Sequence, residues 1–238
     1  MVNRMRRLLL AGLVCLLAAC AQPPLPVAPV ANAPSESPAP ESDRMSMPQL
    51  VASRAAEADQ ALIKAGLIPI LRYEPGIVTE GGTVVNTEPA GGSLVELGAT
   101  VLVYIAGPPG KTLNEYVDAH RETFTGVGVD ANGVLVVGVL QTADLAKEMA
   151  VLTEVAAGRS FRLQACPRTW VDLTKVQVEL SKRRFLPGAD RMAFATAIDP
   201  LACALRMTAD LSDAEVAELT GRYSGALVIQ KGVARRGG

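Results

Sequence analysis

The sequence predicts an α+β fold for the folded part of this 238-residue chain. Segments with apolar residues at helical spacing alternate with short segments rich in Val, Ile and Leu, which is typical of helices and strands that share a core. Glycine-rich turns and one Asn-Gly pair, Asn132-Gly133, separate neighbouring strand patterns. We expect a small domain with one helix on a three-stranded sheet, then a larger α+β domain containing a duplicated strand-strand-helix-strand unit.

Residues 1–19 have the pattern of a signal peptide. Three arginines precede an apolar stretch at residues 8–17, which is shorter than the roughly 20 apolar residues that cross a bilayer. The segment ends in Leu17-Ala18-Ala19-Cys20, which resembles the lipobox of bacterial lipoproteins. That resemblance implies that Cys20 receives diacylglycerol and palmitate and becomes the mature N-terminus. The alternative is an ordinary signal peptide followed by a chance cysteine.

The resemblance also implies a location. Two or three acyl chains anchor a protein stably, because one chain alone gives only marginal binding. Ala21 follows the cysteine, where an Asp would resemble an inner-membrane retention signal. We therefore expect a lipid-anchored protein of the cell envelope, in the outer membrane and facing the periplasm, whose membrane contact is its N-terminal lipid.

Residues 20–46 are expected to form a disordered linker. Residues 233–238 are expected to form a disordered tail. Pro, Ala and Ser dominate the linker, so it cannot bury enough apolar surface to offset the entropy of ordering. Its prolines favour an extended spacer that reaches about 80 Å at about 3.1 Å per residue. An inert disordered stretch would have the same composition.

Composition excludes some partners and restricts the cysteines. Loss of residues 1–19 removes three arginines and no acid, which leaves the mature chain acidic, without a basic tract for nucleic acid. Beyond Cys20 the remaining cysteines are Cys166 and Cys203. In an oxidising periplasm they are candidates for a structural disulfide worth roughly 3–4 kcal/mol. Two buried free thiols are the alternative.

The first domain is predicted at residues 47–108. A helix is expected over residues 55–65, because apolar residues recur on one face, with Gly66 as its stop. Strands are expected from residue 68, at residues 83–85 and at residues 100–105, and we expect them to form an antiparallel sheet.

The landmarks of this segment resemble those of a PASTA domain, in the same order and spacing. They are Met47-Pro48-Gln49-Leu50-Val51, Glu57-Ala58, Leu62, Ala65-Gly66-Leu67, Gly82-Thr83-Val84-Val85, Pro89-Ala90-Gly91, Val95 and Gly98. PASTA domains occur as extracellular repeats on penicillin-binding proteins and serine/threonine kinases. Ala52 is a departure, because the family commonly has Gly there.

The resemblance implies contact with muropeptides or peptidoglycan, although many copies of the domain act only as spacers or docking modules. The sequence offers no aromatic platform beyond Tyr73 and Tyr104. Arg72, Glu74 and Glu88 are available for polar contacts, but the pattern assigns none of them, so the ligand-binding residues remain unknown.

The second domain is predicted at residues 112–232. We expect helices at residues 113–123, 144–155, 173–183 and 213–222, with hairpins at residues 126–140 and 192–207 and strands at residues 160–166 and 226–230. The tetrapeptide Thr142-Ala-Asp144-Leu145 recurs as Thr208-Ala-Asp210-Leu211, which favours a duplication, with chance as the alternative. If the duplication holds, the halves share a sheet or pack as pseudo-symmetric layers.

No constellation of catalytic or metal-binding residues is predicted. The single histidine, His120, has no sequence motif that would pair it with a nucleophile. One histidine is also too few for a zinc site when both remaining cysteines are candidates for a disulfide. The segment Gly107–Thr112 lacks the first glycine of a phosphate loop and is a turn between domains. Trp170 is either a ligand platform or a packing residue beside the disulfide. No cofactor is expected.

These observations predict a non-enzymatic envelope lipoprotein whose PASTA-like domain contacts peptidoglycan or a wall-synthesis partner. The alternative is a partner-binding scaffold, inhibitor or assembly factor for a secreted protein, without wall binding. An undetected hydrolase is a third hypothesis.

Overall fold

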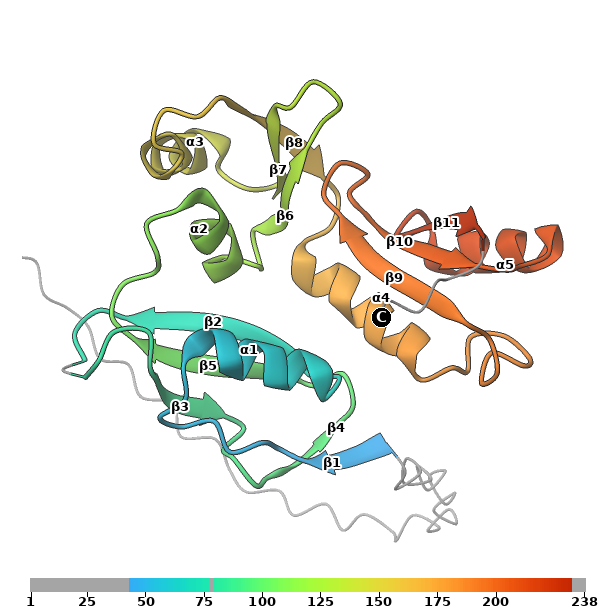
Figure 1. The fold of residues 1–238 in the computed structure, drawn as a ribbon, viewed down its shortest axis with the longest axis horizontal. Helices are drawn as coiled ribbons and strands as arrows, with labels where there is room; N and C mark the ends of the chain where they lie inside the picture. Colours follow the sequence, from blue (N-terminus) through green and yellow to red (C-terminus); the bar gives the residue numbers. More distant parts are fainter. Residues whose placement is uncertain (1–42, 78, 233–238) are drawn as a thin grey trace, which may run out of the picture. The chain divides into compact units, whose positions relative to one another are not determined.

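The structure, a computed structural model, describes residues 43–77 and 79–232. The predicted signal peptide, Cys20, the linker up to residue 42 and the tail lie outside these residues. The described part contains five helices and eleven strands in four small sheets, so the predicted α+β class is confirmed (Figure 1).

The first module consists of one helix on a three-stranded sheet, with a two-stranded sheet beside it. In α1, Ala58 and Leu62 are fully buried against Val101 and Val103 of β5. The helix and strands of this module are β1 (Arg44–Ser46), α1 (Ala55–Lys64), β2 (Ile68–Glu74), β3 (Val84–Glu88), β4 (Leu94–Glu96) and β5 (Thr100–Ala106).

Two expectations for this module are wrong. The sheet is mixed, because β5 lies between β2 and β3, parallel to the first and antiparallel to the second. Residues 44–46, assigned to the linker, form β1 and pair with β4. Strands of three residues carry no alternation that a sequence pattern can detect, so their pairing depends on the tertiary fold.

Ala52 lies where the PASTA resemblance expects glycine. Its φ is +72°, in the left-handed region that glycine adopts without a steric penalty. The backbone therefore has the conformation that favours glycine, although alanine occupies the position.

The second part repeats one topology. In each half the middle strand pairs antiparallel with the preceding strand and parallel with the following one, giving the orders β6-β7-β8 and β9-β10-β11. The elements are α2 (Leu113–Ala119), β6 (Phe124–Val129), β7 (Leu135–Leu140), α3 (Leu145–Val155), β8 (Phe161–Cys166), α4 (Trp170–Ser181), β9 (Phe194–Asp199), β10 (Ala204–Ala209), α5 (Asp213–Tyr223) and β11 (Leu227–Lys231).

The predicted strand-strand-helix-strand unit is present in each half, and the expected helices α2 and α4 precede the two halves. The halves form separate sheets and do not share one sheet. The repeated tetrapeptide is not structurally equivalent. Asp144 caps α3 through its side chain, whereas α5 is capped by Ser212, two residues after Asp210, and Thr208 lies within β10.

Three helix predictions also need correction. Helix α2 ends at Ala119, before the turn that leads into β6, and α4 begins at Trp170 because Thr169 and Asp172 form a capping box. Leu145 and Met149 share helical spacing with Leu152, which predicts burial on one face of α3, yet they are 42% and 40% exposed.

Helix α4 has two buried faces, and these join the first module to the second part. Leu173 and Leu180 belong to the core under β10 and α5. Val171 and Val178 pack instead against β2 of the first module. The helix therefore has too many apolar positions for a single-sided stripe, which is typical of a helix buried between two layers.

A disulfide joins the two halves of the repeat. Cys166, at the end of β8, is bonded to Cys203, immediately before β10. Close packing surrounds the bond, because a Cβ on Gly138 would lie 3.2 Å from the Cys166 sulfur. The β9–β10 turn approaches the same region, where Pro200 packs on Gly126.

Candidate functional site

The structure has a cleft of about 370 Å³ at the first module, lined by α1, β2, the segment around residues 108–110, and α2. We call it the acidic cleft, defined by Asp59, Tyr73, Glu115, Asp118 and Arg121. Its polar groups come from three elements that are far apart in the sequence. The fold brings them together because α2 packs beside β2.

Arg121 is the least accessible of these side chains, with 8% of its surface exposed. Both terminal nitrogens bond the carboxylate of Asp59, with Nη2 3.0 Å from Oδ2. The guanidinium also lies 4.1 Å from the centre of the Trp170 ring. Its Nε is buried without a hydrogen-bond partner among the described residues. Contacts within the protein therefore neutralise the charge of Arg121.

Asp118 has a different environment, although it lies close to Arg121. Its Oδ1 is 3.9 Å from Arg121 Nη2, and 60% of its side chain remains exposed. Desolvation of its carboxyl raises the pKa of Asp118 above the ordinary value, and the nearby Asp59 carboxylate adds to this, while Arg121 opposes it. The Asp118 carboxylate is therefore accessible to a cation of a ligand.

Glu115 and Tyr73 complete the polar lining. The Glu115 carboxylate accepts two hydrogen bonds from Thr112, one from the hydroxyl at 2.7 Å and one from the backbone N–H at 3.0 Å. These hydrogen bonds lower the pKa of Glu115. Desolvation raises the pKa of the Tyr73 hydroxyl, and the cleft carboxylates raise it further against the effect of Arg121. At neutral pH this hydroxyl is a neutral donor or acceptor.

The arrangement suits a cationic ligand group. Three carboxylates face a single guanidinium, which leaves an excess of negative charge when all are ionised. Leu71, Ala55 and Ala56 supply apolar walls for an aliphatic stem. The described residues that line the cleft include no serine, threonine, cysteine or histidine, the usual nucleophiles and bases.

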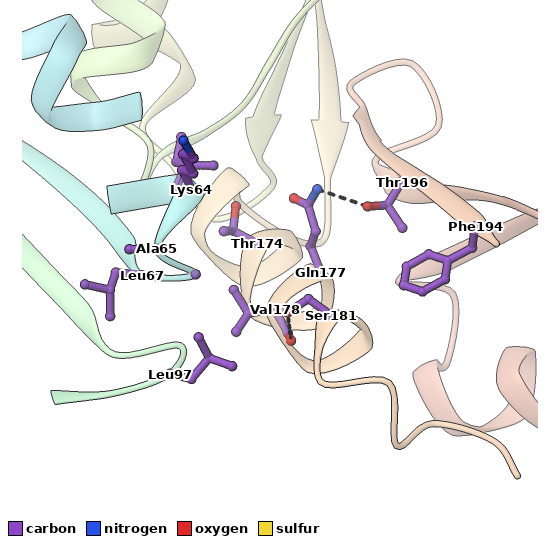
Figure 2. Close-up of a pocket in the computed structure, with 12 residues that line it drawn as sticks. Lys64, Ala65, Leu67, Leu97, Thr174, Gln177, Val178, Ser181, Phe194 and Thr196 are labelled. Atoms are coloured by element: carbon purple, nitrogen blue, oxygen red, sulfur yellow. Dashed lines mark hydrogen bonds between the residues drawn. The ribbon is translucent and has the colours of Figure 1, made fainter. Parts of the chain in front are cut away.

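A second hollow of about 290 Å³ lies between the end of α1 and helix α4 (Figure 2). We call it the α4 crevice. Leu67 and Leu97 line one side, and Val178 and Gln177 line the other, with Phe194 and Thr196 of β9 beyond.

Of the residues singled out from the sequence, Cys166, Trp170 and His120 do not line the acidic cleft. Cys20 lies outside the described residues, and Cys166 is bonded to Cys203 as predicted. Trp170 packs with β2 and Arg121, which makes it a packing residue, although its contacts differ from those expected. His120 Nδ1 donates to the Tyr116 carbonyl at 2.7 Å, assigning the proton to that nitrogen.

The sequence pattern does not indicate the acidic cleft. Arg72, considered for ligand contact, pairs instead with Glu122. Asp59, Asp118 and Arg121 belong to helix patterns in which charged residues normally face solvent. The one available signal was Asp118 three residues before Arg121, and that spacing is common on exposed helices.

Among residues 43–77 and 79–232, none of the helices combines the length and the apolar composition that crossing a bilayer requires. The same residues also contain no cluster of three or more His, Cys, Asp or Glu side chains arranged to hold a metal ion.

No family model matches the sequence, and no curated protein does so significantly. Part of the chain is weakly similar to a solved structure, the entire extracellular region of the Ser/Thr kinase PrkC from Staphylococcus aureus. The identity is 19%, and the match covers 27% of this chain and 22% of that one, with a TM-score of 0.25. The chain thus spans about a fifth of that structure, and the score is too low to support an argument about function.

Proposed function

We propose that this chain is a non-enzymatic lipoprotein of the cell envelope, anchored at Cys20 in the outer membrane, whose acidic cleft binds amino-bearing peptides of peptidoglycan. The observation that carries the proposal is the division of roles in the cleft. Arg121 is neutralised by partly buried Asp59, whereas Asp118 remains 60% exposed.

A primary ammonium on an aliphatic stem fits this division. The ammonium would pair with Asp118 and accept further stabilisation from Glu115, while the stem lies along Leu71. An ion pair at so exposed a carboxylate is worth only about 0–1 kcal/mol. Binding of one peptide is therefore weak, and anchoring at Cys20 would offset this by raising the effective concentration of peptidoglycan peptides near the cleft.

The non-enzymatic assignment rests on the chemistry of the cleft. Asp59 pairs with Arg121, Glu115 accepts hydrogen bonds from the cap of α2, and the cleft lining contains no serine, threonine, cysteine or histidine. Binding without turnover accounts for these residues more simply than hydrolysis.

A partner-binding scaffold, inhibitor or assembly factor is the second candidate. The exposed apolar pair Leu145 and Met149 on α3 favours it, because these side chains lie one turn apart on the same helix face.

Sedimentation with purified sacculi tests the proposal. The soluble form lacking residues 1–20, which keeps every contact described above, should pellet with sacculi, and Asp118→Asn should reduce the pelleted fraction. Asp190→Asn removes the same charge at an exposed surface pair and should leave the fraction unchanged. Wild-type protein that stays entirely in the supernatant would contradict wall binding.

A further inference from the structure

A free sheet edge borders the α4 crevice. Strand β9 is the end strand of the sheet β11-β10-β9, and within the described residues it pairs with β10 alone. Its far end lies near β6, where Pro200 packs on Gly126. The half of β9 around Phe194 and Thr196 therefore has one side without a strand partner in the described part of the chain.

The crevice opens on the side of β9 that faces α4. Phe194 and Thr196, two residues apart on the strand, both line it. Gln177 of α4 donates through Nε2 to the Thr196 hydroxyl at 3.0 Å, which fixes the amide at the crevice wall (Figure 2). Ala195 and Ala197 alternate with these residues and are exposed.

Strand geometry connects the edge with the crevice. A segment paired with β9 would direct every second side chain to the α4 side of the sheet, because side chains alternate between faces. Those side chains would enter the crevice between Val178 and Leu97. Its volume of about 290 Å³ lies at the lower limit of pockets for small ligands, which are about 300–1,000 Å³. A short extended segment fits this space better than a large compact ligand.

The charges at the rim favour an acidic segment. Lys64 lines the crevice and has no carboxylate within ion-pair distance in the described part of the chain. The Arg183 guanidinium lies 5.1 Å from the centre of the Phe194 ring, and it donates to the carbonyls of residues 189, 190 and 192, so it is a fixed positive group beside the lining. The exposed Glu96 precedes Leu97 in the chain, so one acid also lies next to the lining.

Further cations lie next to Ser181, at the end of α4. Lys182 and Arg184 share one carboxylate, that of Asp43, at 3.9 Å and 3.3 Å. Two cations with one acid leave this end of the crevice positive as well.

We propose that the outer edge of β9 and the α4 crevice bind an extended acidic segment of a partner protein by β-strand addition. Backbone hydrogen bonds to β9 would supply affinity, and alternate side chains in the crevice would supply specificity. The rim cations select acidic residues. This interface is separate from the acidic cleft, so it does not depend on wall binding.

The test uses an acetylated hexapeptide of alternating valine and glutamate, added to the soluble form lacking residues 1–20. NMR should show shifts of the amides at residues 194–198 and slower hydrogen exchange at the outer amides of β9. A hexapeptide of alternating valine and lysine should not bind. Lys64→Glu should weaken binding about threefold to tenfold, as for loss and reversal of an exposed ion pair.

Lys147→Glu makes the same charge change on exposed α3 and should leave the affinity unchanged. Three results would overturn the proposal. They are no peptide-dependent shift in β9, equal weakening by the two lysine variants, and β9 amides that are already protected without peptide. The last result would mean that a second copy or another part of this chain occupies the edge. None of these outcomes depends on sacculus binding.

Discussion

Asp59→Ala should destabilise the protein far more than removal of an exposed acid. Arg121 is 8% exposed and Asp59 17% exposed, so the substitution leaves a buried guanidinium without its carboxylate. Breaking a buried pair from one side costs about 3–5 kcal/mol. The Trp170 ring and Asp118 remain near the guanidinium, and we therefore expect the lower end, about 3 kcal/mol.

Urea unfolding followed by circular dichroism measures this cost. A loss of about 3 kcal/mol corresponds to a fall in Tm of about 6–12 °C for a chain of this size. Glu80→Ala is the matched control, because Glu80 pairs with Arg54 at an exposed site and should change stability by less than about 1 kcal/mol.

The double variant Asp59→Leu with Arg121→Met should recover part of the loss, because it removes both charges and keeps apolar volume. If Asp59→Ala costs no more than Glu80→Ala, the interpretation of Arg121 as a buried, neutralised charge is wrong.

Three further predictions concern the disulfide, Ala52 and Asp118. Reduction of the Cys166–Cys203 bond should lower stability by about 3–4 kcal/mol, and mass spectrometry after alkylation without reductant should show no label on either cysteine. Ala52→Gly should raise stability by about 0.5–1 kcal/mol in urea unfolding, because φ is +72° there and glycine avoids the left-handed penalty. The raised pKa of Asp118 means that the folded state holds that proton more tightly than the unfolded state. Protonation of Asp118 therefore stabilises the folded state. This stabilisation is complete below the ordinary pKa of 3.8 and is lost as the pH rises through the raised pKa. Asp118→Asn should therefore raise Tm at pH 7 and give no gain at pH 3, in thermal scans at the two pH values.

The elements of the fold were largely predictable, because each has a local signal. The Asn132-Gly133 turn defines the first hairpin, and Asp144 marks the start of α3. Pairing of Cys166 with Cys203 followed from elimination of the other cysteines. The order of the strands within each sheet was harder to predict from the sequence. Placement of β5 between β2 and β3 depends on contacts across the module, which no local pattern records.

The site was not predictable from the sequence. Asp59 and Arg121 are 62 residues apart. In sequence each resembles an ordinary exposed charge, and the fold brings them together because α2, which ends two residues before Arg121, packs beside β2. Leu145 and Met149 illustrate the converse, because their spacing predicts burial and the fold leaves them exposed. Burial of charge and exposure of apolar groups are tertiary properties, and such positions are where functional surfaces occur.

Titration calorimetry with a purified muropeptide that carries a free side-chain amine tests the central claim most directly. The soluble form lacking residues 1–20 should bind this muropeptide weakly, and its affinity should fall by up to about fivefold when the amine is acetylated or when Asp118 is changed to Asn. The affinity should be unchanged in Asp190→Asn. Equal heats for the free and acetylated muropeptides, or no binding of either, would contradict recognition of an ammonium group by the acidic cleft.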